Sequence, residues 1–263
     1  MKITTTFLVF LVLAVQALTA ANNDWHVIKS KEIGAIPPSA VLKTIKLNTP
    51  QADGTVAEAR LDVLVFPEKN FSLNVLDHPL RDQSLQEVMQ GSHYVAGING
   101  GYFQPNGTPL GLLMHRGTMI HPQERARLLS GFFVATDHKM ALLRVAEPLP
   151  SGTTEILQAG PFLLDHGLPV VGLEGTRSAR RTFLASDNHG LWAMGVISPT
   201  TLAEAARVLQ AASTQIFPTS KIQRALNLDG GSSSALWVAI QPEPFSQQEF
   251  GRVRNFLGLK AHE

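Results

Sequence analysis

The chain contains no cysteine. This absence excludes disulfides, thiolate nucleophiles and zinc sites built on cysteine. A chain of 263 residues buries enough surface on folding to be stable without such cross-links. The lack of cysteine is therefore compatible with an exported protein, and it restricts any catalytic chemistry to other side chains.

The chain also lacks an excess of charge of either sign. It has 22 Lys and Arg residues against 21 Asp and Glu residues. Removal of a leader that contains Lys2 and no acid would leave the two counts equal. Strong binding to nucleic acid depends on the neutralisation of many phosphates, so we expect no nucleic-acid partner.

Long hydrophobic runs are absent except at the N-terminus. There, Lys2 supplies a positive charge, residues 7–15 form an apolar segment, and residues 17–21 offer small side chains to a signal peptidase. This order of charge, apolar segment and small residues is typical of a secretory signal peptide.

A membrane anchor is the alternative, because the uncharged stretch over residues 3–21 has nearly the ~20 apolar residues that cross a bilayer. The threonines, Gln16 and the small residues at its end favour cleavage. We therefore predict a signal peptide over residues 1–21 and one domain over residues 22–263. The protein would be periplasmic or secreted, with no membrane insertion after cleavage.

Short strand-like runs dominate the remainder, while helix signals are few. Capping boxes at residues 84–87 and 201–204 predict a short helix ending near Gly91 and a longer one reaching about Ala212. Residues 220–226 suggest a third helix. We therefore predict an α+β fold: a single strand-rich domain with a mixed β-sheet and a few flanking helices. The predicted strands are 41–47, 60–66, 71–76, 94–99, 131–136, 139–145, 153–157, 182–186 and 191–197.

Two glycine-rich segments are the strongest candidates for a site. The first, Asn99-Gly100-Gly101-Tyr102, follows a predicted strand. Its glycines permit unusual dihedrals and close approach to a ligand, although a bulge or tight turn explains the segment equally well. The second, residues 227–234 (NLDGGSSS), places a carboxylate, two glycines and three hydroxyls between apolar runs. Backbone nests of this kind bind anions, whereas a mere polar linker seldom lies between apolar segments.

Two further segments are less informative on their own. Residues 177–182 (RSARRT) open a predicted strand, and arginine suits bidentate contact with phosphate or carboxylate. For Arg177 and Arg180 we favour a solvated basic turn. Residues 158–161 (QAGP) read as a strand end followed by a rigid turn.

In this order, the four segments resemble the phosphodiester glycosidase family over roughly residues 85–257. The resemblance implies that Asn99, Gly101, Arg181 and Asp229 converge in a common cleft. Ser232 and Ala185 stand where the family usually has glycine, which we expect to add atoms near that cleft.

The resemblance implies an exported hydrolase that cleaves a sugar from a glycosyl phosphodiester at the anomeric carbon. Asp229 would be the base or nucleophile, Arg181 would offset charge on the phosphate, and Asn99 would hold sugar or phosphate oxygens. One clear carboxylate is compatible with this chemistry, because a phosphate monoester leaves without a strong general acid. The predicted substrate-binding residues are Gly100, Gly101, Tyr102, Gly160, Thr182, Asn227, Gly230, Gly231, Ser232 and Ser233.

Other functions stay open at this stage. One is a non-catalytic envelope or polysaccharide-binding module on the same fold. Another is a serine hydrolase that uses residues 232–234, although a helix should follow its nucleophile and a strand-like run follows here. His93, His115 or His121 could act as acid or base. The histidines show no spacing typical of metal ligands. Whether a divalent cation joins the site is not decided by the sequence.

The leader generates the first testable prediction. The exported protein should begin at Ala21 or Asn22, because the small residues before this point suit signal peptidase. Intact-mass measurement of the envelope fraction checks this. A membrane-bound species that retains residues 1–20 would contradict cleavage and favour an anchor.

Overall fold

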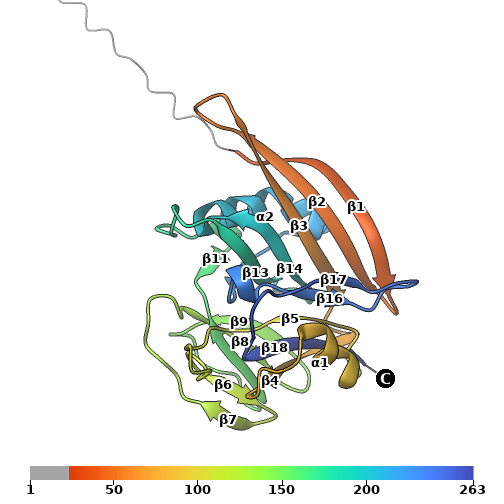
Figure 1. Ribbon diagram of the computed structural model, residues 1–263, viewed down its shortest axis with the longest axis vertical. Coiled ribbons are helices and arrows are strands. Elements are labelled where there is room, and N and C mark those ends of the chain that lie inside the picture. The colour runs from red at the N-terminus through yellow and green to blue at the C-terminus, as the bar shows by residue number, and fades with distance from the viewer. Residues whose placement is uncertain (1–23, 263) are drawn as a thin grey trace, which may run out of the picture.

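The computed structural model describes residues 24–262, so the predicted signal peptide lies outside the described part. This part forms three β-sheets and contains two α-helices (Figure 1). Every strand pairing in it is antiparallel. The predicted α+β class with a mixed sheet is therefore wrong: the described chain is mostly β.

The largest sheet has eight strands and carries one helix. Helix α2 (Leu202–Ile216) begins at the capping box of Thr201 and Glu204, and it covers one face of this sheet (Figure 1). Its buried residues, among them Val208 and Leu209, complete an apolar cluster with the sheet. In spatial order the strands are β1 (His26–Ile36), β2 (Ala40–Pro50), β3 (Val56–Pro67), β14 (Leu191–Thr200), β13 (Ala179–Ser186), β15 (Arg224–Asn227), β11 (Phe162–Asp165) and β12 (Leu168–Pro169).

Two five-stranded sheets make up the rest. In the second sheet the order is β7 (Thr118–His121), β6 (Leu113–His115), β10 (Glu155–Ala159), β8 (Gly131–Ala135) and β9 (Met140–Arg144). In the third sheet it is β17 (Phe245–Gln247), β16 (Leu236–Val238), β5 (Ala96–Asn99), β18 (Asn255–Ala261) and β4 (Phe71–Asp77). Helix α1 (Leu85–Gly91) lies against β5 and β16.

The three sheets meet in one apolar cluster, the largest in the described chain. It includes Leu64 and Leu226 of the first sheet, Leu157 of the second, and Ile98 and Leu257 of the third. Since hydrophobic stabilisation grows with the apolar area removed from water, this junction holds the sheets together. The strand ends that carry the motifs emerge beside it.

The structure corrects two local expectations. The segment predicted as a third helix, 220–226, is a loop over residues 220–223 followed by the start of β15, whose backbone pairs with β11 on one side and β13 on the other. Tertiary pairing has overridden local propensity here. Strand β1 was not predicted, since its residues are mostly polar and exposed at the edge of the sheet. Neither α-helix of residues 24–262 has the length and apolarity needed to cross a membrane.

Candidate functional site

The buried side-chain amide of Asn99 links the first sheet to the third at the site. Asn99 ends β5, is 0% exposed, and donates from Nδ2 to the Asp229 carbonyl at 2.8 Å. Its Oδ1 accepts from the Thr182 hydroxyl at 2.7 Å and from the Ala235 amide at 3.0 Å. Strand β13 of the first sheet and the segment 228–235, which crosses to the third, are thereby fixed to β5. Both ends of this amide are therefore occupied by groups of the protein itself.

Close approach, rather than an unusual dihedral, requires glycine at Gly100, and at Gly101 a Cβ would lie a tight 3.1 Å from the Gln158 carbonyl. Neither has a positive φ. The Gly100 amide donates to the Asn255 carbonyl at 2.8 Å, and the Gly101 amide donates to Asn255 Oδ1 at 2.7 Å. A Cβ on Gly100 would lie 2.0 Å from Asn255 Oδ1. The Asp229 amide donates to the Gly100 carbonyl at 3.0 Å, so the same turn also holds the second motif.

A short hydrogen-bond chain connects Tyr102, Asn227 and Gly160. The Tyr102 hydroxyl donates to the Gly160 carbonyl at 2.7 Å and accepts from Asn227 Nδ2 at 2.8 Å. Burial raises the pKa of Tyr102, and the nearby Asp229 carboxylate adds to the increase. Gly160 has φ +150°, and a Cβ there would lie 2.3 Å from the Leu128 carbonyl. The segments 99–102, 227–234 and 158–161 therefore meet around the Tyr102 hydroxyl.

Asp229 is a half-buried carboxylate at the start of the glycine–serine loop. Its Oδ1 accepts the Gly230 amide at 2.9 Å. Burial raises the pKa of Asp229, while the Ser233 hydroxyl, the Gly230 amide and the charge of Arg177 act in the opposite direction. No Lys, Arg or His of residues 24–262 forms an ion pair with it.

Arg181 is a buried cation. It is 8% exposed, and its Nε donates to the Thr200 carbonyl at 2.9 Å while Nη2 donates to the Arg177 carbonyl. Burial lowers its pKa, but a guanidinium stays charged at any physiological pH. Two neutral carbonyls thus hold the group in place, and no acid in the described chain forms an ion pair with it.

The glycine–serine loop follows Asp229 and approaches the strand that carries Arg181. A Cβ on Gly230 would lie 2.8 Å from the Arg180 carbonyl and 3.8 Å from Arg181 Cδ. Residues 231–233 form one 3₁₀ turn, with Ser232 exposed and Ser233 buried. Ala185, by contrast, is fully buried in the core beneath α2, so the expectation that it adds atoms near the site is wrong.

The three histidines considered from sequence lie apart from this cluster. His115 Nδ1 contacts the Glu155 carboxylate at 3.2 Å, and His121 Nδ1 contacts the Gly111 carbonyl at 3.0 Å. His93 is exposed. Among residues 24–262, no group of three or more His, Asp or Glu side chains is arranged to hold a metal ion.

The sequence reasoning missed the contacts of Asn255 and of Arg180, whereas Arg177 is exposed, as a solvated turn predicts. Asn255 lies outside every motif and meets Gly100 and Gly101 only through the pairing of β18 with β5. Arg180 donates from Nε to the Gly231 carbonyl at 3.3 Å, and the Arg177 carbonyl anchors Arg181. The arginine-rich pattern 177–181 was a usable signal for Arg180, whereas the carbonyl of residue 177 would be present with any side chain.

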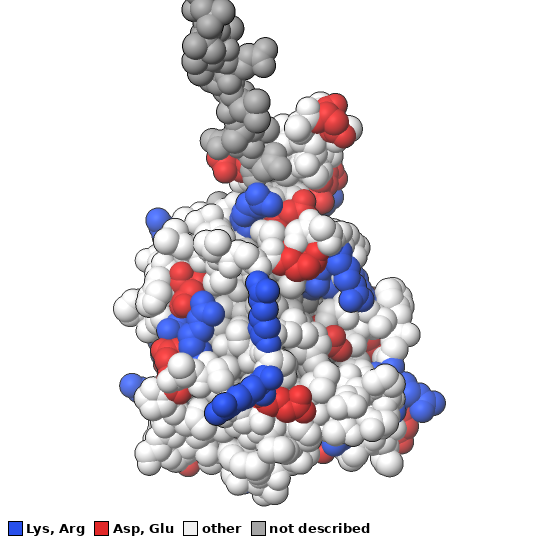
Figure 2. All heavy atoms as spheres, turned by 90° about the vertical axis from the view of Figure 1, so that its left-hand side faces the viewer, with Lys and Arg blue, Asp and Glu red and all other residues white. Residues whose placement is uncertain are grey.

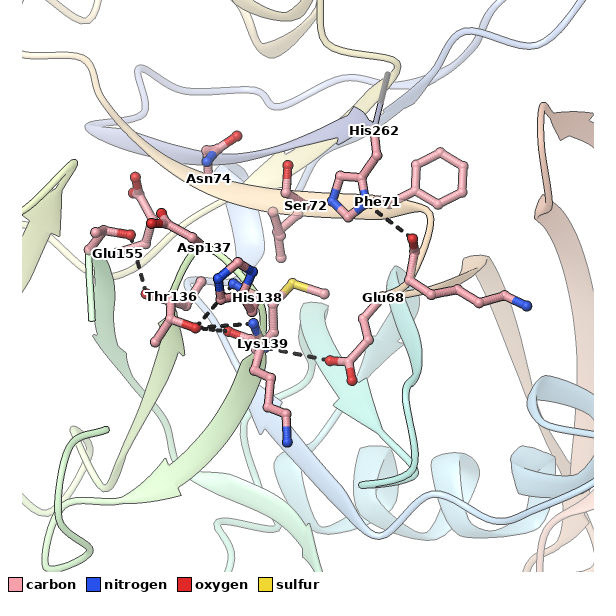
Figure 3. A pocket seen from close by; sticks show the side chains of 15 residues that line it. Glu68, Phe71, Ser72, Asn74, Thr136, Asp137, His138, Lys139, Glu155 and His262 are labelled. Atoms are coloured by element: carbon pink, nitrogen blue, oxygen red, sulfur yellow. Dashed lines mark hydrogen bonds between the residues drawn. The ribbon is translucent and has the colours of Figure 1, made fainter. Parts of the chain in front are cut away.

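A separate cavity of about 480 Å³ lies between β4 and the turn that joins β8 to β9 (Figure 3). Ser72, Asn74, His138 and His262 are among its lining residues, and none of the predicted site residues is. On the face shown in Figure 2, basic and acidic side chains are interspersed.

A comparison with known protein families identifies the class of protein. A model of the phosphodiester glycosidase family matches residues 92–260, which is more than half of the chain. The chain therefore belongs to the phosphodiester glycosidase family, as its motifs predicted.

Two solved structures have a similar fold at low sequence identity. One is the zebrafish N-acetylglucosamine-1-phosphodiester alpha-N-acetylglucosaminidase catalytic domain, auto-inhibited by its pro-peptide: TM-score 0.65 and 15% identity, over 91% of this chain and 88% of that chain. The other is a hypothetical protein from Synechocystis: TM-score 0.54 and 13% identity, over 92% of this chain and 81% of that chain. No curated protein matches the chain in sequence.

The contact between Gly100 and Asn255 generates the second testable prediction. Gly100→Ala should lower the melting temperature and abolish activity, because its Cβ would overlap Asn255 Oδ1 and such overpacking costs about 1–3 kcal/mol. Thermal denaturation checks this. Gly91→Ala is the control, since its Cβ has no neighbour within 4 Å. Equal melting temperatures for the two variants would contradict the close approach.

Proposed function

We propose that the protein is an exported hydrolase that cleaves a sugar from a glycosyl phosphodiester at the anomeric carbon. Asp229 is its base or nucleophile and Arg181 is its phosphate-binding cation. Asn99 is a positioning residue, since its side-chain amide donates to the Asp229 carbonyl and so orients the backbone there. Gly230, Gly231, Ser232 and Ser233 border the space in which the substrate binds.

The observation that carries the proposal is a pair of partly buried opposite charges without ion-pair partners. Burial of a charge costs free energy unless it is paired, yet neither Asp229 nor Arg181 has an ion pair within residues 24–262. Both act on the pKa of Tyr102, which the charge of Asp229 raises and the charge of Arg181 lowers, and this supports a position near that hydroxyl for each. A phosphodiester bound there gives Arg181 an anion and presents the anomeric carbon to Asp229.

The leaving group explains why one carboxylate suffices. Ordinary glycosidases use two carboxylates, because an alkoxide leaving group must be protonated. A phosphate monoester has a second pKa of about 6 and leaves as an anion when a cation offsets its charge. Arg181 supplies that cation. The raised pKa of Asp229 makes its carboxylate a stronger base than an exposed aspartate.

The serine-hydrolase alternative loses support from the geometry of the loop. A serine nucleophile is activated by an adjacent base. In the described chain no histidine hydrogen-bonds to Ser232, Ser233 or Ser234, and the last of these hydroxyls is buried without a partner. Strand β16, rather than a helix, follows the loop. The other alternative is a non-catalytic module on the same fold. A measurement of turnover distinguishes it from an enzyme.

The direct test is hydrolysis of a panel of sugar-1-phosphodiesters, with and without chelator. The zebrafish relative is named for N-acetylglucosamine-1-phosphodiester, which makes such diesters the first substrates for the panel. Release of free sugar supports the proposal, and loss of release with chelator would add a divalent cation to the site. Binding without turnover across the panel would establish the non-catalytic module instead. The proposed location, periplasmic or secreted, follows from the leader.

Asp229 generates the third prediction. Asp229→Asn should reduce turnover by at least about 10²-fold, because the neutral amide is neither base nor nucleophile. Its melting temperature at pH 7 should be unchanged or higher, since the variant removes a buried charge. In the wild type, kcat/KM should fall as pH decreases through a midpoint above about 3.9, the ordinary value for aspartate. Asp137→Asn, an exposed position, is the control. Near-normal turnover of Asp229→Asn would refute the assignment.

Arg181 generates the fourth prediction. Arg181→Lys keeps the charge but loses the planar fork that spans the Thr200 and Arg177 carbonyls. We expect kcat/KM for a phosphodiester to fall by at least about tenfold, and a smaller loss for an activated aryl glycoside, whose leaving group carries no phosphate. Arg207→Lys on the exposed side of α2 is the control. An equal loss on both substrates would make Arg181 purely structural.

A further inference from the structure

An exposed aromatic ring lies beside the proposed site. Phe250 is 81% exposed, the most exposed aromatic residue in the described chain. A single exposed apolar side chain is common in folded proteins, so exposure alone assigns nothing. What distinguishes Phe250 is the way in which it is held and the loop to which it is attached.

The backbone of Phe250 is fixed to the glycine–serine loop. Its amide donates to the Ser232 carbonyl at 2.7 Å. On the preceding residue, Glu249 Oε1 accepts the Leu85 amide at the start of α1, at 2.7 Å. The segment is therefore tied on one side to the site and on the other to a helix.

The ring itself rests on Arg180. The Arg180 Cζ lies 4.4 Å from the centroid of the ring. Its Nη1 and Nη2 each donate to the Gln248 carbonyl at 3.2 Å, and its Nε donates to the Gly231 carbonyl at 3.3 Å. One face of the ring is thus covered by a guanidinium that is itself anchored on both sides, and the other face is left for solvent or a ligand.

This position suits a ring of the substrate. Three Cα steps of ~3.8 Å separate Asp229 from Ser232, so the two Cα atoms lie within roughly 11 Å, a distance that one or two sugar units can span. Anchored aromatic side chains with one open face are frequent in ligand sites, because a flat apolar surface covers the C–H face of a sugar ring at little entropic cost.

We propose that Phe250 is a stacking platform for a pyranose ring of the substrate, and that it sets specificity for the sugar rather than for the phosphate. The inference rests on the proposed function. Arg180 supports the ring, and it adds a second cation next to Arg181 in the sequence. The platform lies outside the reacting centre and acts on binding.

The fifth prediction tests this platform by kinetics. Phe250→Ala should raise KM for a glycosyl phosphodiester about tenfold, the size expected of one lost stacking contact, and leave kcat within about twofold. Phe250→Trp should retain the wild-type KM. Val56→Ala, another exposed apolar position, lies at the start of β3 and is the control. An unchanged KM for Phe250→Ala would overturn the platform.

Two additional measurements separate the possible failures. If Phe250→Ala raises KM for a diester with a long alkyl aglycone but not for the methyl diester of the same sugar, the ring contacts the aglycone and the sugar platform is refuted. If the wild type hydrolyses no diester, the proposed function fails by itself. The platform is then judged by fluorescence of the Phe250→Trp variant titrated with methyl glycosides: a shift in indole emission that Val56→Trp does not show supports it, and no shift overturns it.

Discussion

The side-chain amide of Asn99 is the interaction on which the rest of the site depends. It is completely buried, and it joins the end of β5 to the Thr182 hydroxyl, the Ala235 amide and the Asp229 carbonyl. A buried polar group left without partners costs about 1–3 kcal/mol, so each of these contacts also requires the others. These contacts hold the chain between β15 and β16 on its path from the first sheet to the third, and Asp229 lies on that path.

With the backbone fixed in this way, the charges of the site are left uncompensated. Asp229 receives hydrogen bonds without a cationic partner in the described chain, and Arg181 is held by two carbonyls. The raised pKa of Asp229 means that its ionisation opposes folding: the folded state is favoured at low pH, and this contribution is lost as pH rises through the raised pKa. The packing of the three sheets offsets the free-energy cost of these unpaired buried charges.

Sequence reasoning identified segments that the structure brings together, but it missed some of the contacts that hold them. Glycine doublets and an Asp–Gly–Gly–Ser run are local signals, so the first and second motifs could be found without knowledge of the fold. Asn255 could not be found in this way, because it meets Gly101 across 154 positions of sequence and only through strand pairing. The fold class was wrong for a related reason: capping boxes mark helices reliably, whereas the direction of strand pairing and the strand β15 depend on contacts far along the chain.

The order of residues in the first motif follows from the position of each on the strand. Asn99, the last residue of β5, points into the interior and holds the crossover. Gly100 and Gly101 then donate their amides to Asn255, and at Gly100 a side chain would overlap Asn255 Oδ1. Tyr102 emerges beyond them and reaches the Gly160 carbonyl. Four consecutive residues thus fix three distant segments. Exchanging Asn99 with Gly100 would remove the amide from the crossover and place a side chain against Asn255. The motif is contiguous because one strand end has to perform all three attachments.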